Sequence, residues 1–462
     1  MQITIMDNNP LTYKTDWLGS KPVYYNTVTG AVSHDIWQVI DITSFEFHPE
    51  GLANYLKFGY SILGQTPVKN VRFLNPLSEI TTGANAVDTI KTYKDTVPDL
   101  LHQASNPNDV IAAIKKDIND WEKTTSGPVV LPLSGGLDSR LLLWSLNDKK
   151  RVRAFTYGGA PKQELSHEVV YASEIARRQG VSWEHIKLGN YHNLMDKWIE
   201  WFGPAVHAHG MYQMEFYNSL ISRGLSGNNL LSGIIGDIWA GNLTVNEISS
   251  PAELINLGYT HGLHADSNYS VLKHNNELVS EYFENNKFLL KDPIYRVVAS
   301  MRLKIMLLRY LITVPENMGF VPWTPFLKME NAIAMLNLPY EQRKDRKWQR
   351  DFFKSQNLNI EETKLKHTRS NTLNFQALKL IPVKPLNTEL LSEIIHPGYT
   401  NWINKHLTQK TTLWELYHKI MITPRIKEVA RMAGCKNIKA EAYAAYLTLK
   451  PLETLIKKRN EL

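Results

Sequence analysis

Leu131-Pro-Leu-Ser-Gly-Gly-Leu-Asp-Ser-Arg140 is the stretch of this 462-residue chain that decides the fold. The apolar residues from Val129 to Leu133 are typical of a buried strand, and the apolar pattern that resumes at Leu141 is typical of a helix. We therefore predict that Ser134 to Ser139 forms a turn between a strand and a helix.

A turn of this kind predicts an anion site. The first N–H groups of a helix have no helical carbonyl to bind, and the helix dipole adds positive charge where they point. Gly135 and Gly136 let the main chain approach a ligand closely, while Ser134 and Ser139 add hydroxyl donors. We expect the ligand to be a phosphate or pyrophosphate group.

Asp138 indicates that a cation accompanies this phosphate. A carboxylate and a phosphate repel each other unless a cation lies between them, and Mg²⁺ with oxygen ligands is the usual solution for a nucleotide. No Gly-Lys-Ser/Thr follows, so the turn is not a Walker loop. The alternative is a plain turn without a ligand. We therefore expect a nucleotide together with Mg²⁺.

Ser134-Gly-Gly-Leu-Asp-Ser139 resembles the pyrophosphate loop (PP-loop) of the N-type ATP pyrophosphatases, which convert ATP to AMP and pyrophosphate to adenylate a substrate. A second turn, Ser232 to Gly241, is similar to the S-G-x-x-x-D-x-x-x-G loop of asparagine synthetases and β-lactam synthetases. We expect Asp138 and Asp237, one from each turn, to hold Mg²⁺. The resemblance implies that the nucleotide is ATP and that these residues bind it: Leu133, Ser134, Gly135, Gly136, Leu137, Asp138, Ser139, Phe155, Tyr157, Ser232 and Gly233.

Composition sets the outer limits. The length predicts two or three domains, and 43% hydrophobic with 21% charged residues is typical of a soluble globular protein. No apolar run is long enough to span a membrane and no signal peptide is evident, so we expect a cytoplasmic protein. The net charge of +7 is scattered, which does not indicate a nucleic-acid partner. With Cys435 alone, no disulfide forms within the chain.

Residues 1–105 resemble the rear part of the glutamine amidotransferase domain of asparagine synthetases, on the segments Gly19–Tyr25, Leu52–Tyr60 and Thr66–Pro76. The family's glutaminase uses a cysteine at position 2, where this chain has Gln2. The resemblance therefore implies a degenerate α+β domain of the N-terminal-nucleophile (Ntn) glutaminase type that does not hydrolyse glutamine.

Local patterns within this region predict three elements. Trp17–Tyr25 and Trp37–Asp41 are expected to pair as a hairpin through the turn at Asn26–Gly30. A helix is expected from Pro49 to Phe58, and a strand from Val71 to Leu74.

Residues 106–462 are predicted to form an α/β synthetase domain with a parallel sheet and a helical C-terminal part. Strands are expected at Val152–Tyr157 and Trp183–Lys187, with a helix from Ser166 to Gln179 between them. Ligands collect beyond the carboxyl ends of such strands, and the resemblance places adenine and ribose near Phe155 to Gly158. One long helix is expected over residues 292–314, and more helix over 402–462, with these core candidates: Trp414, Leu416, Tyr417 and Ile420.

The residues expected near the acyl acceptor depart from the family. Ile234 stands where asparagine synthetases have Glu and β-lactam synthetases have Tyr, and Val321, Trp323 and Lys328 replace the Glu, Arg and Asp around a later "R-x-P-F-L-D" segment. Free aspartate is therefore not the expected substrate.

Two sets of cations are candidates for the chemistry. The resemblance implies that Lys366, with Lys364 as the alternative, stabilises negative charge in the transition state beside Asp237. Arg302, Lys304 and Arg309 lie within the long expected helix, where they either bind a substrate carboxylate or are solvated.

These observations predict an AMP-forming amide ligase that adenylates the carboxylate of a small molecule or peptide and transfers an amine to it. Formation of a peptide macrolactam, as in lasso-peptide synthetases, would bring a precursor peptide and a processing protease as partners. The alternatives are amidation of a sugar acid in surface polysaccharide synthesis and a non-catalytic nucleotide sensor.

Overall fold

The computed structural model describes residues 11–82, 89–258, 263–408 and 434–462, together with isolated positions between 417 and 432. Gln2, Trp414 and Leu416 lie outside the described residues. Ile420 is exposed, which contradicts its predicted place in the core, whereas Tyr417 is half-buried.

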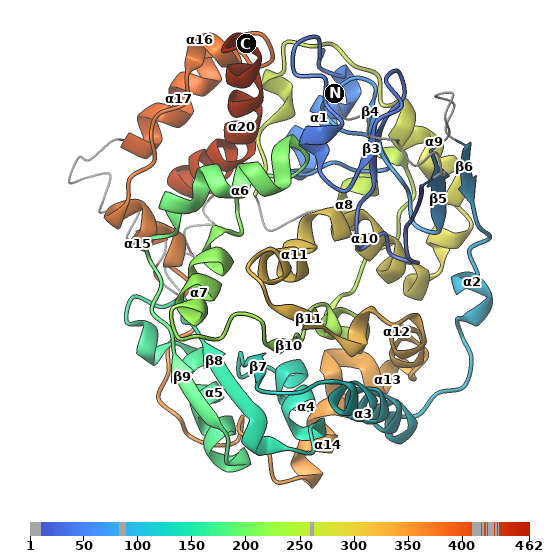
Figure 1. Ribbon diagram of the computed structural model, residues 1–462, viewed down its shortest axis with the longest axis vertical. Coiled ribbons are helices and arrows are strands. Elements are labelled where there is room, and N and C mark those ends of the chain that lie inside the picture. Colours follow the sequence, from blue (N-terminus) through green and yellow to red (C-terminus); the bar gives the residue numbers. More distant parts are fainter. Residues whose placement is uncertain are drawn as a thin grey trace, which may run out of the picture.

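A five-stranded parallel sheet lies at one end of the molecule (Figure 1). The strand order is β11-β10-β7-β8-β9, so the winding reverses between β7 and β10, which pair at Val129 and Asn229. The strands that the sequence predicted are confirmed with small shifts at their ends. The five strands are β7 (Val129–Pro132), β8 (Val152–Thr156), β9 (Ser182–His185), β10 (Asn229–Leu231) and β11 (Val321–Trp323).

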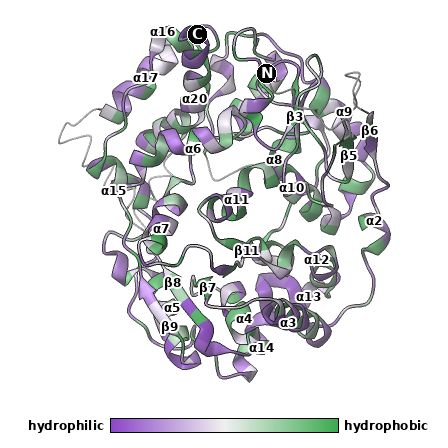
Figure 2. Cartoon of the chain, in the orientation of Figure 1, coloured by the Kyte–Doolittle hydropathy of each residue, from purple (hydrophilic) through white to green (hydrophobic). Residues whose placement is uncertain are grey.

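The burial of the strands differs between the centre and the edge of this sheet. The side chains from Val129 to Leu131 in β7 are buried, whereas β9 at the edge alternates between exposed and half-buried residues. Figure 2 shows the same contrast between a hydrophobic β7 and a hydrophilic β9. Helix α4 (Leu137–Ser145) follows β7, and α5 (His167–Gln179) ends at Gly180 with φ 64°, as the sequence predicted.

The described part of the N-terminal region contains two antiparallel three-stranded sheets and the α-helices α1 and α2 (Val97–Leu100). The helix α1 (Pro49–Phe58) begins with proline and ends at Gly59 in the left-handed conformation, so its prediction is confirmed. One sheet has the order β1-β5-β6 and the other β3-β2-β4. Their strands are β1 (Thr12–Lys14), β2 (Tyr24–Asn26), β3 (Val32–Ser33), β4 (Val71–Phe73), β5 (Ser78–Thr81) and β6 (Thr89–Thr92).

The predicted hairpin forms with a different second arm. Strand β2 pairs with β3, and Trp37 lies instead in the short 3-10 helix η1 (Ile36–Gln38). The Asp35 side chain accepts a hydrogen bond from the Trp37 N–H, and this cap stabilises a helical turn where the sequence pattern predicted a strand.

The C-terminal part is helical, as expected. The helix predicted over residues 292–314 is observed as α10 (Pro293–Leu308) and α11 (Tyr310–Asn317), which meet at Arg309, where the backbone keeps helical dihedrals of φ −55° and ψ −24°. The longest described helix is α20 (Ile438–Asn460). Other helices are α2 (Val97–Leu100), α3 (Pro107–Thr124), α6 (Met195–Phe202), α7 (Met211–Ile221), α8 (Ile255–Gly258), α9 (Glu277–Asn286), α12 (Met329–Leu336), α13 (Tyr340–Arg343), α14 (Lys347–Ser355), α15 (Leu373–Leu380), α16 (Thr388–Leu391) and α17 (Pro397–Thr408). Across the described segments, no helix has the length and apolar character needed to cross a bilayer.

The N-terminal region shares one hydrophobic core with the rest of the protein. Trp17 donates a hydrogen bond from its indole to the Leu327 carbonyl at 2.8 Å, and the buried Tyr55 hydroxyl donates to the Thr448 carbonyl of α20 at 2.9 Å. Figure 1 shows α1 beside α20, although the two helices lie at opposite ends of the sequence. The predicted boundary at residue 105 and the Ntn type of this region stay predictions.

We expect Tyr55→Phe to reduce the free energy of unfolding by about 1–2 kcal/mol, because it removes a buried hydrogen bond and leaves the Thr448 carbonyl without its partner. Urea denaturation followed by tryptophan fluorescence measures this change. Tyr340→Phe is the matched control, since Tyr340 is 61% exposed, and it should stay within about 0.5 kcal/mol of wild type. Equal midpoints for both variants would contradict a stabilising contact between α1 and α20.

Candidate functional site

The two predicted turns lie against each other at the carboxyl ends of β7 and β10. A Cβ built on Gly233 would lie 3.5 Å from the Ser139 nitrogen, and one built on Gly236 would lie 3.0 Å from the Asp138 Cγ. On its other side, the Gly236 Cβ would lie 2.8 Å from the Phe326 ring. A glycine at 236 is therefore what allows the second turn to pack over Asp138.

A cavity of about 610 Å³ lies over both turns. Most of the predicted nucleotide-binding residues line it. Those residues are Leu133, Ser134, Gly136, Asp138, Ser139, Phe155, Tyr157, Ser232 and Gly233, and the predicted magnesium ligand Asp237 lines the cavity with them. Gly135 and Leu137 belong to the same turn but are not part of the lining; Gly135 has φ 73°, and a Cβ there would lie 2.6 Å from the Tyr171 Cβ.

Hydroxyl groups hold the first turn in shape. The Ser134 N–H donates to the Ser139 hydroxyl at 3.2 Å, and the Gly136 N–H donates to the Ser134 hydroxyl at 3.3 Å. No side chain caps the N-terminus of α4 at Gly136. The first turn of α4 therefore presents backbone N–H groups and positive dipole to the cavity, which suits an anion.

Asp138 and Asp237 face the same cavity, as the two-turn arrangement requires. The pKa of Asp138 is raised to about 6: burial raises it most, the Arg346 guanidinium opposes this with a smaller effect, and the Asp237 charge adds to the rise. Asp237 accepts a hydrogen bond from the Asn242 amide at 2.9 Å. Two neighbouring carboxylates with one elevated pKa fit a divalent cation, because a cation would relieve their repulsion.

Arg346 is a site residue that the sequence did not reveal. Its guanidinium forms an ion pair with Asp138 and donates to Gln349 at 2.7 Å, and the Gln349 amide donates to Asp138 at 3.3 Å. Asp345 and Arg346 both have positive φ, 51° and 60°, an uncommon conformation for non-glycine residues that is often found at functional sites.

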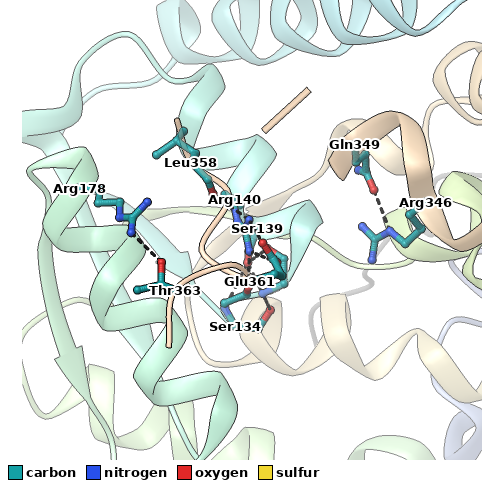
Figure 3. A network of polar contacts seen from close by, with 11 residues as sticks. Ser134, Ser139, Arg140, Arg178, Arg346, Gln349, Leu358, Glu361 and Thr363 are labelled. Atoms are coloured by element: carbon teal, nitrogen blue, oxygen red, sulfur yellow. Dashed lines mark hydrogen bonds and ion pairs between the residues drawn. The ribbon is translucent and has the colours of Figure 1, made fainter. Parts of the chain in front are cut away.

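An ion pair between the buried Arg140 and the more exposed Glu361 connects the first turn to the loop that carries Lys364 and Lys366 (Figure 3). The Arg140 side chain is fully buried and donates to the Gly135 carbonyl at 3.0 Å and to the Glu361 carboxylate at 2.7 and 3.0 Å. Burial tends to raise the pKa of Glu361, but hydrogen bonding to Arg140 and its charge outweigh this effect and leave the pKa lowered. Arg140 therefore fixes the position of both loops.

Lys366 does not line the cavity. Its side chain is exposed, and the adjacent backbone runs along the start of α5, where the His167 N–H donates to the Thr368 carbonyl at 2.9 Å. The catalytic role of Lys366 stays a prediction.

The far side of the cavity is aromatic and polar. The Tyr157 hydroxyl accepts a hydrogen bond from the Gln213 amide at 3.0 Å, and the Tyr157 ring lies 5.5 Å from that of Phe216. These contacts build an aromatic wall with polar groups at its edge, which suits a purine base. Further lining residues that the sequence did not indicate are Glu168, Tyr212, Asn371 and Asn374.

The doubly wound sheet, with its site at the reversal of strand order, defines an α/β protein with a nucleotide-type site. Residues 123–237 match the family model described as asparagine synthase. The matched segment contains the first turn and the second turn as far as Asp237, so this part of the chain is similar to an asparagine synthase domain, and the match supports an ATP-utilising ligase.

Two solved structures also match in part. The glutamine-dependent NAD⁺ synthetase from Acinetobacter baumannii in complex with ADP shares 17% identity over 52% of this chain, with a TM-score of 0.21, and the match spans 42% of that protein. The NH₃-dependent NAD synthetase from Campylobacter jejuni in complex with the nitrate ion shares 19% identity over 55% of this chain and 97% of its own length, with a TM-score of 0.19. A search of curated proteins gives no match.

We expect Asp138→Asn to make the unliganded protein more stable at neutral and alkaline pH. The pKa of Asp138 rises from 3.8 to about 6 on folding, so its ionisation opposes folding. The gain over wild type should be near zero at pH 4, grow as the pH rises through about 6, and reach at most about 3 kcal/mol. Thermal unfolding between pH 4 and 8 measures it, with the exposed Asp351→Asn as control; a gain that is independent of pH would contradict the elevated pKa.

We expect Glu361→Gln to reduce the free energy of unfolding by about 1–3 kcal/mol, since it leaves the buried Arg140 guanidinium without a charged partner. Differential scanning calorimetry measures this loss. The neighbouring Glu362→Gln is the matched control, because Glu362 is 65% exposed and makes only a surface pair with Lys354. If both variants unfold like wild type, Arg140 and Glu361 do not fix the two loops.

Proposed function

We propose that this chain is an AMP-forming, ATP-dependent ligase that makes an amide from a carboxylate and an amine. The observation that carries this proposal is the position of Asp138 and Asp237 in one cavity, beside the uncapped N-terminus of α4. A helix N-terminus binds phosphate, and two carboxylates beside it suit Mg²⁺ rather than a bare phosphate.

Each part of the site has a proposed task. The first turn of α4 and the hydroxyls of Ser134 and Ser139 bind phosphate oxygens, and Asp138 and Asp237 hold Mg²⁺. Bound Mg²⁺ would neutralise phosphate charge and so make the pyrophosphate a better leaving group. Arg346 lines the same cavity and places a guanidinium beside the phosphates.

The proposed reaction has two steps. A carboxylate oxygen of the substrate forms a bond to the α-phosphorus of ATP. The bond between the α-phosphorus and the oxygen that bridges it to the β-phosphorus breaks, and pyrophosphate leaves with that oxygen and the electron pair. The amine nitrogen then attacks the acyl carbon, AMP leaves with the bridging oxygen, and the amine loses a proton. Lys366 is the proposed cation for the negative charge of these transition states.

The amine is proposed to belong to the substrate itself, because this chain has no cysteine at position 2 and Ile234 replaces the polar residues of the related acceptor sites. Macrolactam formation in a peptide fits this requirement, with a precursor peptide and a protease as partners. Amidation of a sugar acid uses the same two steps with a separate amine.

A non-catalytic nucleotide sensor is the second candidate. The observation that favours it is the ion pair between Arg346 and Asp138, which occupies one of the two proposed metal ligands. A sensor would bind ATP with Mg²⁺ and form no AMP.

The first test measures Mg²⁺-dependent ATP binding by isothermal titration calorimetry. The second test measures the formation of AMP and pyrophosphate. Pooled peptides and uronic acids supply the carboxylate in this second test, and hydroxylamine serves as a general amine. We expect Asp237→Asn to weaken Mg²⁺–ATP binding roughly tenfold or more, because it removes a charged ligand of the cation. Asp351→Asn, an exposed carboxylate of α14, should bind like wild type.

The outcomes separate the candidates. AMP with hydroxamate formation supports the ligase, and binding without AMP favours the sensor. ATP binding that is unchanged in Asp237→Asn would contradict both.

A further inference from the structure

A second cavity, of about 980 Å³, lies beyond Ile234. Ile234 lines both this second cavity and the cavity over the two turns, which we call the nucleotide cavity after its proposed ligand. On α11, Leu311 lines the nucleotide cavity and its neighbour Ile312 lines the second cavity. The N-terminal region supplies another wall, including Pro22. The second cavity is therefore adjacent to the nucleotide cavity and lies between the N-terminal region and the segment from Ile305 to Leu327.

Arg309 lines this second cavity and is only 6% exposed. Among the described residues, its guanidinium makes one hydrogen bond, from Nη2 to the Tyr24 hydroxyl at 2.9 Å, and its buried Nε atom has no partner there. The guanidinium also lies 5.2 Å from the centre of the Phe202 ring. Within the described parts of the chain, no carboxylate lies at ion-pair distance from it.

The neighbouring Arg302 on α10 shows how this fold normally accommodates a buried guanidinium. Arg302 forms an ion pair with Asp95 and donates to the Trp17 carbonyl at 3.0 Å. A buried charge without such a partner destabilises the folded state, so its presence beside a cavity indicates that an anion completes the site.

The other charged groups of the cavity do not neutralise Arg309. Asp35 lines the cavity, but its carboxylate accepts the Trp37 N–H at 2.9 Å and forms no ion pair with Arg309. Glu200 is exposed, and Glu316 pairs with Lys21 at 3.6 Å where both side chains are exposed.

We propose that this second cavity binds an anionic group of the substrate, a carboxylate on an apolar stem, and that Arg309 is its recognition residue. The stem fits because the remaining lining is largely apolar. These apolar residues include Trp201, Ile305, Ile312, Phe320 and Leu327. The volume is that of a typical small-molecule site.

The identification of this anion as part of the substrate rests on the proposed ligase function. A substrate that fills both cavities passes Ile234, with one carboxyl group at the nucleotide and another at Arg309. The expected substrate class is therefore a dicarboxylic molecule or peptide with an apolar portion between its two acidic groups.

The test measures binding of dansyl-leucine and of its uncharged analogue dansyl-leucinamide by fluorescence, without ATP. We expect wild type to bind the acid roughly tenfold tighter than the amide, because the guanidinium makes charge-assisted hydrogen bonds to the carboxylate. Arg309→Gln, which retains a donor for Tyr24, should abolish this preference, and Arg309→Lys should restore part of it. Unfolding curves of each variant establish that it is folded.

Two further variants locate the bound probe. Lys21→Met removes an exposed cation of the same cavity and should keep the preference for the acid. Ile312→Trp fills the apolar part and should weaken both probes. Equal affinity of wild type for acid and amide, a preference retained in Arg309→Gln, or unaltered binding in Ile312→Trp would each overturn the proposal.

The two proposals fail in different ways. Because the probes are measured without nucleotide, absence of AMP formation would not change these results. If AMP forms but the dansyl acid is not preferred, only the role of Arg309 is refuted.

Discussion

The close contact between Gly236 and Asp138 is the constraint on which the site depends. It exists because β7 and β10 are neighbours where the winding of the sheet reverses, so the turns that follow them end at the same edge. Any side chain at position 236 would press on the Asp138 carboxyl group or on the Phe326 ring. The absence of a side chain therefore allows two segments about a hundred residues apart to enclose one cavity.

The packing of the two turns brings two carboxylates close together. Two arginines form ion pairs at this site, and the two pairs have different roles. Asp138 is buried near Asp237, which raises its pKa, and Arg346 supplies a compensating charge from a strained left-handed position. Arg140 instead uses Glu361 and the Gly135 carbonyl to hold the turn itself. The first ion pair lies within the cavity that we propose for the nucleotide, whereas the second is a scaffold beneath it.

The N-terminal region packs into the rest of the protein and lines one side of the second cavity. It shares the hydrophobic core of the larger part, donates backbone-directed hydrogen bonds from Trp17 and Tyr55, and places Tyr24 against Arg309. A region that resembles a glutaminase but has no cysteine at position 2 can still serve the proposed reaction in this way, by enclosing a substrate cavity.

The sequence by itself determined the local elements and the two turns: the apolar run before Ser134 and the glycine that ends α1 act over a few residues, so their pattern is sufficient. The tertiary structure decided the rest. Asp35 caps a turn where a strand was predicted, and Arg346 reaches Asp138 from far along the chain. These features depend on which distant groups become buried together, and burial, unlike periodicity, is a property of the packed chain.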